Sequence, residues 1–155
     1  ALHGAGVACE IRHQTGGRWA EVVSTSYTDL GLDADVSAFL AEPWKSLGEA
    51  DLVVARSGAL TVSELAAAGR GAVLVPFSAA AGNHQEYNAR SLERAGGAVV
   101  LTEGEASSER VAEVLGAILN DPNAVRTMAA AASTMALPSA ARRIAERVLA
   151  IGGGS

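Results

Sequence analysis

Hydrophobic and polar residues follow two patterns along this chain, short apolar runs and longer stretches with helical spacing. The apolar runs are bounded by polar or turn residues, which is typical of buried strands. One further run near the start alternates apolar and polar positions and ends before a pair of glycines, which also indicates a strand. These patterns predict strands at residues 7–13, 36–40, 52–55, 72–75 and 98–101.

The stretches between and after the strands predict helices. Pro43 suits the first turn of one helix, and Gly69 suits the C-terminal end of another. The predicted helices cover residues 19–29, 43–49, 61–68, 84–95, 107–119, 123–135 and 139–150. Strands that alternate with helices predict parallel βαβ units, and hence a Rossmann-like, doubly wound α/β sheet.

The first residues do not fit the usual opening of such a sheet. Residues 1–6 resemble the end of a helix and a turn, and no Gly-rich phosphate turn precedes the strand at 7–13. We therefore expect residues 1–151 to form a domain that lacks its first unit, and residues 152–155 to be a flexible tail or linker. A strand left without its neighbour becomes an edge, which predicts partial instability or self-association.

Composition narrows the class of protein. The chain has 155 residues, of which 49% are apolar and 4% aromatic, which suits one domain with an aliphatic core. A net charge of −5 argues against a nucleic-acid partner. The single cysteine, Cys9, excludes a disulfide within the chain and a metal site made of several cysteines. No signal-peptide pattern and no membrane-spanning apolar run is present in the sequence, and a reducing cytosol fits.

The segment at 50–77 contains a candidate anion site. The chain passes from a predicted strand to a predicted helix through a turn of mostly small residues, Arg56, Ser57, Gly58, Ala59 and Leu60. The first N–H groups of a helix are unpaired and lie at its positive end, so such a turn binds a diphosphate well. Glu64, one turn into the helix, is placed to accept hydrogen bonds from a ribose diol. The pattern leaves open an ordinary turn capped by Ser57 or Thr61, with Glu64 as a solvated acid.

A second polar cluster enters the next predicted helix. His84, Gln85 and Asn88 fall at i, i+1 and i+4, so His84 and Asn88 share one helical face. Amide side chains both donate and accept hydrogen bonds, which suits sugar hydroxyls. The alternative is a helix capped by Asn83 whose other polar residues are solvent-exposed.

Together these segments resemble the donor domain of the MurG family. Members of that family transfer N-acetylglucosamine from UDP-N-acetylglucosamine to a lipid-linked muramoyl-pentapeptide, lipid I, and form lipid II in peptidoglycan synthesis. The family carries a run like RSGALTVSELAAAG, then a strand that ends in VPF or VPY, then a loop with HQ and NA. The matching residues here are 56–69, 75–77, 84–85 and 88–89, with further likeness at 13–16, 36–40 and 51–52.

The resemblance implies one half of a GT-B fold and an inverting transfer without a metal or other cofactor. It implies that the backbone N–H groups of Ala59, Leu60 and Thr61 hold the donor diphosphate, and that Glu64 binds the ribose. Charge on the departing UDP would then be stabilised by the helix N-terminus.

The resemblance also implies which residues contact the uracil and the sugar of the donor. It implies that the backbone at Phe39 and Leu40 contacts the uracil edge. Gln85, with His84 and Asn88 nearby, would contact the N-acetylglucosamine. The remaining turn residues are Arg56, Ser57 and Gly58. For Arg56 the choice between stabilising the departing diphosphate and forming a structural ion pair stays open.

Several family features have no counterpart in this sequence. The family's first donor-domain strand with its Gly-Gly-Ser-x-Gly-Ala loop is absent, and so is its N-terminal acceptor domain. We therefore assign no catalytic residue, because the general base is expected in that domain, as is contact with the lipid-linked acceptor at the cytoplasmic face of the inner membrane. Gly71 stands where a proline is common, which we interpret as a minor loop change, and residues 78–82 match loosely.

Two other functions stay open. One is the donor domain of another UDP-sugar-dependent GT-B glycosyltransferase, and the other is a non-catalytic or engineered α/β module. We interpret His13 as a partly buried structural histidine, and the cluster of Arg142, Arg143 and Arg147 as a solvated helix face.

Overall fold

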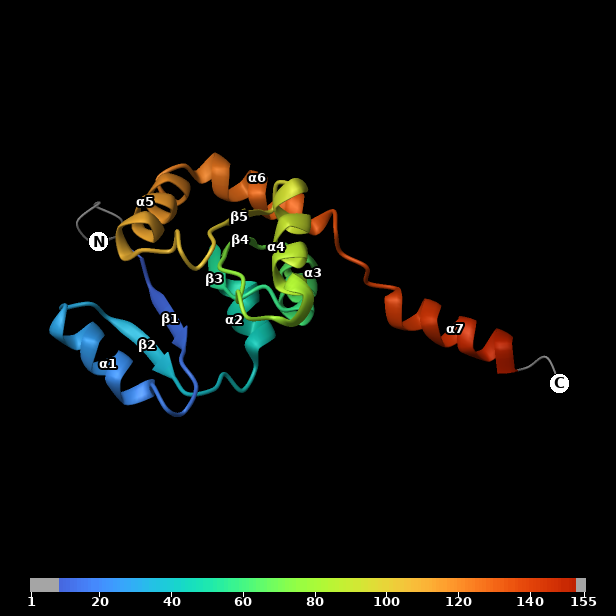
Figure 1. The fold of residues 1–155 in the computed structure, drawn as a ribbon, viewed down its shortest axis with the longest axis horizontal. Coiled ribbons are helices and arrows are strands. Elements are labelled where there is room, and N and C mark those ends of the chain that lie inside the picture. Colours follow the sequence, from blue (N-terminus) through green and yellow to red (C-terminus); the bar gives the residue numbers. More distant parts are fainter. Residues whose placement is uncertain (1–8, 153–155) are drawn as a thin grey trace.

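A computed structural model describes residues 9–152, and its strands and helices alternate along the chain (Figure 1). The strands are β1 (Ile11–Gln14), β2 (Ala34–Ser37), β3 (Leu52–Ala55), β4 (Gly71–Leu74) and β5 (Ala98–Val100). Each paired strand runs parallel to its neighbour. The expectations for residues 1–8 and for residues 153–155 lie outside the described residues.

The helices agree with the predicted positions within a few residues at each end. They are α1 (Ala20–Asp29), α2 (Pro43–Glu49), α3 (Ala59–Ala68), α4 (His84–Arg94), α5 (Ser108–Leu119), α6 (Pro122–Ser133) and α7 (Ala140–Gly152), with a short 3₁₀ turn at Ala81–Asn83. The predicted α/β class with parallel strands is therefore confirmed.

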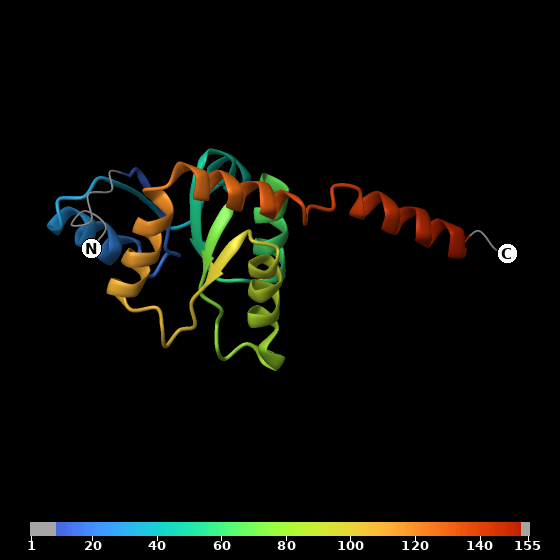
Figure 2. The same ribbon diagram turned by 90° about the horizontal axis from the view of Figure 1, so that it is seen from above.

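The core is built on both faces of β4. Ala72 and Leu74 point to one face and pack with Leu65 of α3 and Leu92 of α4. Val73 lies in a second cluster with residues of α5. Helices α3 and α4 consequently cover one side of the β3–β5 sheet and α5 covers the other, as Figure 2 shows. Helix α6 contributes to both clusters and packs against β4. Helices therefore cover both faces of the sheet, which is the doubly wound arrangement.

The parallel strands of the predicted doubly wound fold are paired in two groups. The strands form two separate ladders, β1–β2 and β3–β4–β5. Among residues 9–152, β1 bonds only to β2 and β3 bonds only to β4, so each has one edge without a partner strand in this part of the chain. None of residues 9–50 is buried, although α1 packs against β2. The expected unpaired strand edge is thus present, while instability and self-association stay predictions.

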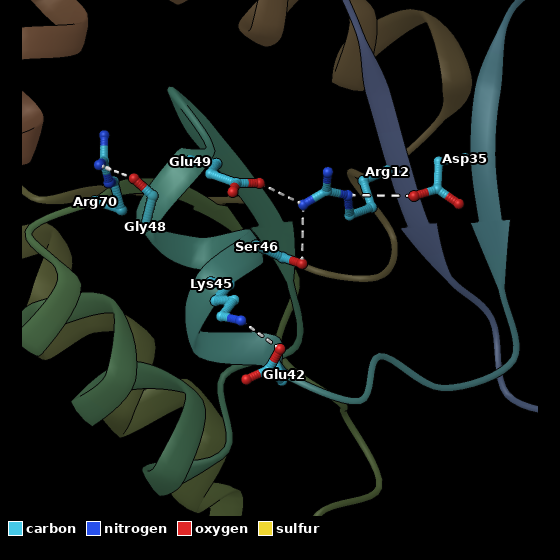
Figure 3. A network of polar contacts seen from close by, with 8 residues as sticks. All are labelled: Arg12, Asp35, Glu42, Lys45, Ser46, Gly48, Glu49 and Arg70. Atoms are coloured by element: carbon cyan, nitrogen blue, oxygen red, sulfur yellow. Dashed lines mark hydrogen bonds and ion pairs between the residues drawn. The ribbon is translucent and has the colours of Figure 1, made fainter.

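Polar contacts link the first ladder to the rest of the chain (Figure 3). Arg12 of β1 lies between β2 and α2: its Nε is 3.3 Å from Asp35, and its Nη1 donates to Glu49 at 2.8 Å. The same Nη1 also donates to Ser46 at 3.1 Å. These side chains are largely exposed, and exposed ion pairs contribute little to stability because water and salt screen them. The first ladder is therefore held by fewer stabilising contacts than the β3–β5 sheet.

Several element boundaries differ from prediction by one to four residues, and two of the differences have a clear reason. Strand β2 covers Ala34–Ser37 and not 36–40, because it ends where its partner ends, with Ser37 paired to Gln14. Helix α3 begins at Ala59, two residues earlier than predicted, because Gly58 is its N-cap. The alternative in which Ser57 or Thr61 caps this helix is wrong.

Gly71 is not a loop position. It is the first residue of β4 and is buried, and a Cβ at this position would lie 2.8 Å from Cβ of Met128 on α6. The expectation of a minor loop change is therefore wrong, because α6 packs too closely against the strand here to leave room for a side chain.

Helix α7 projects away from the other helices and strands (Figures 1 and 2). None of its residues is buried, and residues 141–152 are exposed, among them Ile144 and Val148. The interpretation of its three arginines, Arg142, Arg143 and Arg147, as a solvated face is confirmed.

Candidate functional site

The turn after β3 places unpaired backbone N–H groups at the carboxyl edge of the sheet. The first backbone bond of α3 runs from the Val62 N–H to the Gly58 carbonyl at 3.0 Å. The N–H groups of Ala59, Leu60 and Thr61 precede that bond and have no partner among the described residues. Because no side chain caps the helix, three donors at its positive end are available to an anion.

Glu64 lies on the same face of α3 as this anion site. It follows Thr61 by three residues and Leu60 by four, which brings the side chains together on a helix. Its side chain is partly buried and makes no hydrogen bond or ion pair within the described part of the chain. The carboxylate is therefore available as an acceptor one turn from the three N–H groups.

Ser57 and Asn88 fix the turn to α4. Ser57 is fully buried, and its hydroxyl donates to the Gln85 carbonyl at 2.8 Å. The Asn88 side-chain amide donates to the Ser57 carbonyl at 3.1 Å. Both side chains thus hold the backbone around the anion site in place, and a direct ligand contact by either of them stays a prediction.

Gln85 joins α4 to the loop after β4. Its side-chain carbonyl accepts from the Phe77 N–H at 3.0 Å, which leaves its amide NH₂ group for another partner. His84 is the first residue of α4 and is exposed. Asn83 occupies the N-cap in a left-handed conformation, with φ of 54°, but its side chain makes no capping bond. Asn83 is thus the N-cap residue, as in the alternative interpretation, but it caps the helix without a side-chain hydrogen bond.

Arg56 forms an ion pair across the carboxyl edge of the sheet. Its Nη1 lies 2.7 Å from Glu103, and it donates to the carbonyls of Val75 and Pro76 at 3.2 Å each. The guanidinium also lies over the ring of Phe77 at 5.6 Å. The structural ion pair, one of the two possibilities left open for Arg56, is present, and a role toward the departing diphosphate stays untested.

Glu103 is the site residue that the sequence did not indicate. One of its oxygens faces Arg56, and the other accepts from both the N–H and the hydroxyl of Ser78. Hydrogen bonds from Ser78, and then the Arg56 guanidinium, hold the pKa of Glu103 below its ordinary value. No sequence signal identifies Glu103, because an acid in a turn after a strand is usually solvated.

Phe39 and Leu40 lie in the loop after β2, which belongs to the β1–β2 ladder and not to the β3–β5 sheet. The Leu40 N–H donates to the Gln14 side chain at 3.0 Å, and Phe39 is 75% exposed. In the part of the chain that the structure describes, no hydrogen bond connects them to α3 or α4. Their predicted role toward a uracil ring thus rests on the resemblance and is not tested by these contacts.

The structure also bears on His13, on metal binding and on membrane spans. His13 is partly buried, and its Nδ1 lies 3.1 Å from the Tyr27 hydroxyl, which confirms its structural interpretation. Among residues 9–152 there is no group of three or more His, Cys, Asp or Glu side chains that could hold a metal ion. No helix within the same residues is long and apolar enough to cross a membrane.

Comparison with known proteins gives a consistent assignment. The C-terminal domain of glycosyltransferase family 28 matches residues 2–144. A relative from Xanthomonas euvesicatoria pv. vesicatoria (strain 85-10), named UDP-N-acetylglucosamine--N-acetylmuramyl-(pentapeptide) pyrophosphoryl-undecaprenol N-acetylglucosamine transferase, is 44% identical over 140 residues, which are 90% of this chain and 32% of the relative. A relative of the same name from Marinobacter nauticus (strain ATCC 700491 / DSM 11845 / VT8) is 39% identical over 145 residues, or 94% of this chain and 40% of the relative.

A solved structure agrees with these matches. The crystal structure of Acinetobacter baumannii MurG superimposes with a TM-score of 0.84 and 31% identity, covering 95% of this chain and 43% of that one. The chain therefore spans between a third and somewhat more than two fifths of the proteins that it resembles. The likeness confirms the α/β fold and the family resemblance: the chain belongs to glycosyltransferase family 28 and corresponds to the C-terminal domain of that family.

Proposed function

We propose that this chain is the donor-binding part of an inverting glycosyltransferase that transfers N-acetylglucosamine from UDP-N-acetylglucosamine to lipid I and forms lipid II. The observation that carries the proposal is that, within residues 9–152, the N–H groups of Ala59, Leu60 and Thr61 have no partner and the Glu64 carboxylate one turn away has none either. Such a helix start attracts a diphosphate, and the carboxylate suits the two hydroxyls of a ribose. A uridine diphosphate group presents both a diphosphate and a ribose diol.

The chemistry asked of this half is charge stabilisation. As the bond between the sugar and the diphosphate breaks, negative charge grows on UDP. Donors that are already oriented toward that charge stabilise the transition state without further reorganisation. The N–H groups at the start of α3 are oriented in this way because Ser57 and Asn88 hold the turn against α4. We assign the general base and the lipid-linked acceptor to a second domain, and expect no turnover from this chain alone.

The proposal also accounts for the break between the two strand ladders. In a doubly wound sheet of order 3-2-1-4-5-6, a strand that precedes β1 in sequence lies between β1 and β3. The break between the two ladders falls at that place, which supports residues 1–151 as an incomplete donor domain. Ligands of such sheets bind beside this switch point, where the turn at Gly58 also lies. The cytoplasmic location that the resemblance implies belongs to the same proposal.

Sugar preference separates this proposal from a donor domain for another UDP-sugar. We expect UDP-N-acetylglucosamine to raise the melting temperature more than UDP-glucose does at equal concentration. A ligand that binds only the folded state stabilises it by about 2.7 kcal/mol at a hundredfold excess over Kd. In Gln85→Ala the ratio of the affinities for UDP-N-acetylglucosamine and UDP-glucose should fall by about three- to tenfold, which is the equivalent of one net hydrogen bond.

Tyr87→Ala is the matched control for that experiment. Tyr87 lies on the same turn of α4 and is 71% exposed, so its truncation should leave the sugar preference unchanged. A preference for UDP-glucose in the unaltered chain would favour another UDP-sugar. A well-folded chain that responds to no uridine nucleotide would favour a module without this ligand.

A further inference from the structure

The Glu103 carboxylate stands where three loops of the carboxyl edge meet. It belongs to the loop after β5. Through one oxygen it holds Arg56 from the end of β3, and through the other it holds Ser78 from the loop after β4. No other acid in the part of the chain that the structure describes joins three strand ends in this way.

The loop after β4 is therefore fixed at two successive residues. The Phe77 N–H is held by the Gln85 side chain, and the Ser78 N–H is held by Glu103 at 3.1 Å. Displacement of Ser78 moves Phe77 as well, because the two share a peptide bond. The orientation of the Gln85 side chain consequently depends on a carboxylate that does not contact it.

A second connection reaches the same glutamine from the other side. Arg56 precedes Ser57, whose hydroxyl donates to the Gln85 backbone carbonyl. Glu103 fixes Arg56 against the carbonyls of Val75 and Pro76. The carboxylate thus steadies the segments on either side of Gln85.

We propose that Glu103 is a positioning residue for the sugar end of the donor site, which acts by holding the Phe77–Ser78 segment and Arg56 around Gln85. The inference rests on the proposed function and adds a determinant of sugar preference to it. Glu103 touches neither the sugar nor the diphosphate in this account. Uridine diphosphate itself is held by α3, whose first turn makes no hydrogen bond to Glu103.

The test compares the affinities for UDP-N-acetylglucosamine and for UDP, measured by calorimetry on the whole chain. In Glu103→Gln the side-chain NH₂ cannot accept a hydrogen bond, so the contact with either Arg56 or Ser78 is lost. We expect the ratio of the two affinities to fall by about three- to tenfold, the equivalent of one net hydrogen bond, while the affinity for UDP changes less than about twofold. Glu103→Asp, one methylene shorter, should give an intermediate ratio.

Glu105→Gln is the matched control. Glu105 lies in the same loop, and its carboxylate likewise accepts an N–H and a hydroxyl, but both come from Thr102. Both bonds reach one oxygen, which the glutamine side chain retains, so this replacement removes the negative charge from the loop without touching Arg56 or Ser78. The affinity ratio of this variant should equal that of the unaltered chain.

A pH profile separates positioning from loss of stability. The charged groups that face Glu103 are Arg56 and, across the hollow that both acids line, Glu86 of α4. Because the pKa of Glu103 is lowered, its contribution is present above the ordinary carboxyl pKa and is lost as pH falls through the lowered value. The affinity ratio should decline over that range in the unaltered chain and in Glu86→Gln, and should not decline further in Glu103→Gln.

The outcomes distinguish the two proposals. If UDP binds every variant equally and Glu103→Gln keeps the full sugar preference, the positioning role is overturned and the proposed function stands. If no variant binds UDP, both are overturned. A loss of preference in Glu105→Gln equal to that in Glu103→Gln would also contradict the positioning role, since it would show a general effect of the loop.

Discussion

A Glu64→Ala variant is expected to bind UDP about ten- to a hundredfold more weakly than the unaltered chain. A hydrogen bond to a charged group contributes about 1.5–3 kcal/mol, and each 1.4 kcal/mol is a factor of ten in Kd. Glu64 makes no hydrogen bond or ion pair within the described residues, so its truncation should leave the fold intact. Calorimetric titration with UDP, supported by a melting curve of the free variant, measures both effects.

Glu113→Ala provides the control for the change in net charge. Glu113 is an exposed acid on α5 that forms an ion pair with Arg110, 2.7 Å away on the same helix. Its loss should leave the affinity for UDP unchanged. Equal affinities in Glu64→Ala and in the unaltered chain would contradict the placement of the ribose beside Glu64.

The largest expected effect on stability is that of Leu74→Ala. Leu74 is fully buried on β4, where it packs with residues of α3 and α4. A buried leucine cut to alanine typically lowers the free energy of unfolding by about 2–5 kcal/mol, because apolar contacts are lost and a cavity remains. Urea denaturation followed by circular dichroism measures the change.

Leu149→Ala is the matched control for that substitution. Leu149 lies on α7 and is 73% exposed, so the same truncation should change the free energy of unfolding by less than about 0.5 kcal/mol. Similar losses at both positions would mean that α7 is packed in solution and that the projecting arrangement in Figure 1 is not the one populated.

Local signals were enough to predict most of the fold. Helix α2 begins at Pro43 and ends at Glu49 as predicted, and β3 covers the predicted Leu52–Ala55. Both have clear boundaries in sequence, a proline in one case and an apolar run in the other. The start of α3 was missed because a glycine N-cap leaves no side-chain signal, so the pattern favoured Thr61 over Ala59.

Features that depend on distant residues could not be predicted from local pattern. Glu103 gains its place in the site from Arg56 and Ser78, which lie far from it in sequence and near it only after β3, β4 and β5 align. The division into two ladders is likewise a property of strand pairing, which periodicity does not report. The resemblance to known motifs indicates a candidate anion site, but it does not show that Ser57 is buried as a support for the turn.

The measurement that tests the central claim most directly is a UDP titration of the ¹⁵N-labelled chain followed by amide NMR. The account predicts that the largest chemical-shift changes fall on the N–H groups of Ala59, Leu60 and Thr61, because these donors gain a hydrogen-bond partner when the diphosphate binds. The exposed helix α7 should show no change. Saturable binding that leaves those three amides unmoved, or an absence of any change in a folded sample, would contradict the assignment of the donor site to the start of α3.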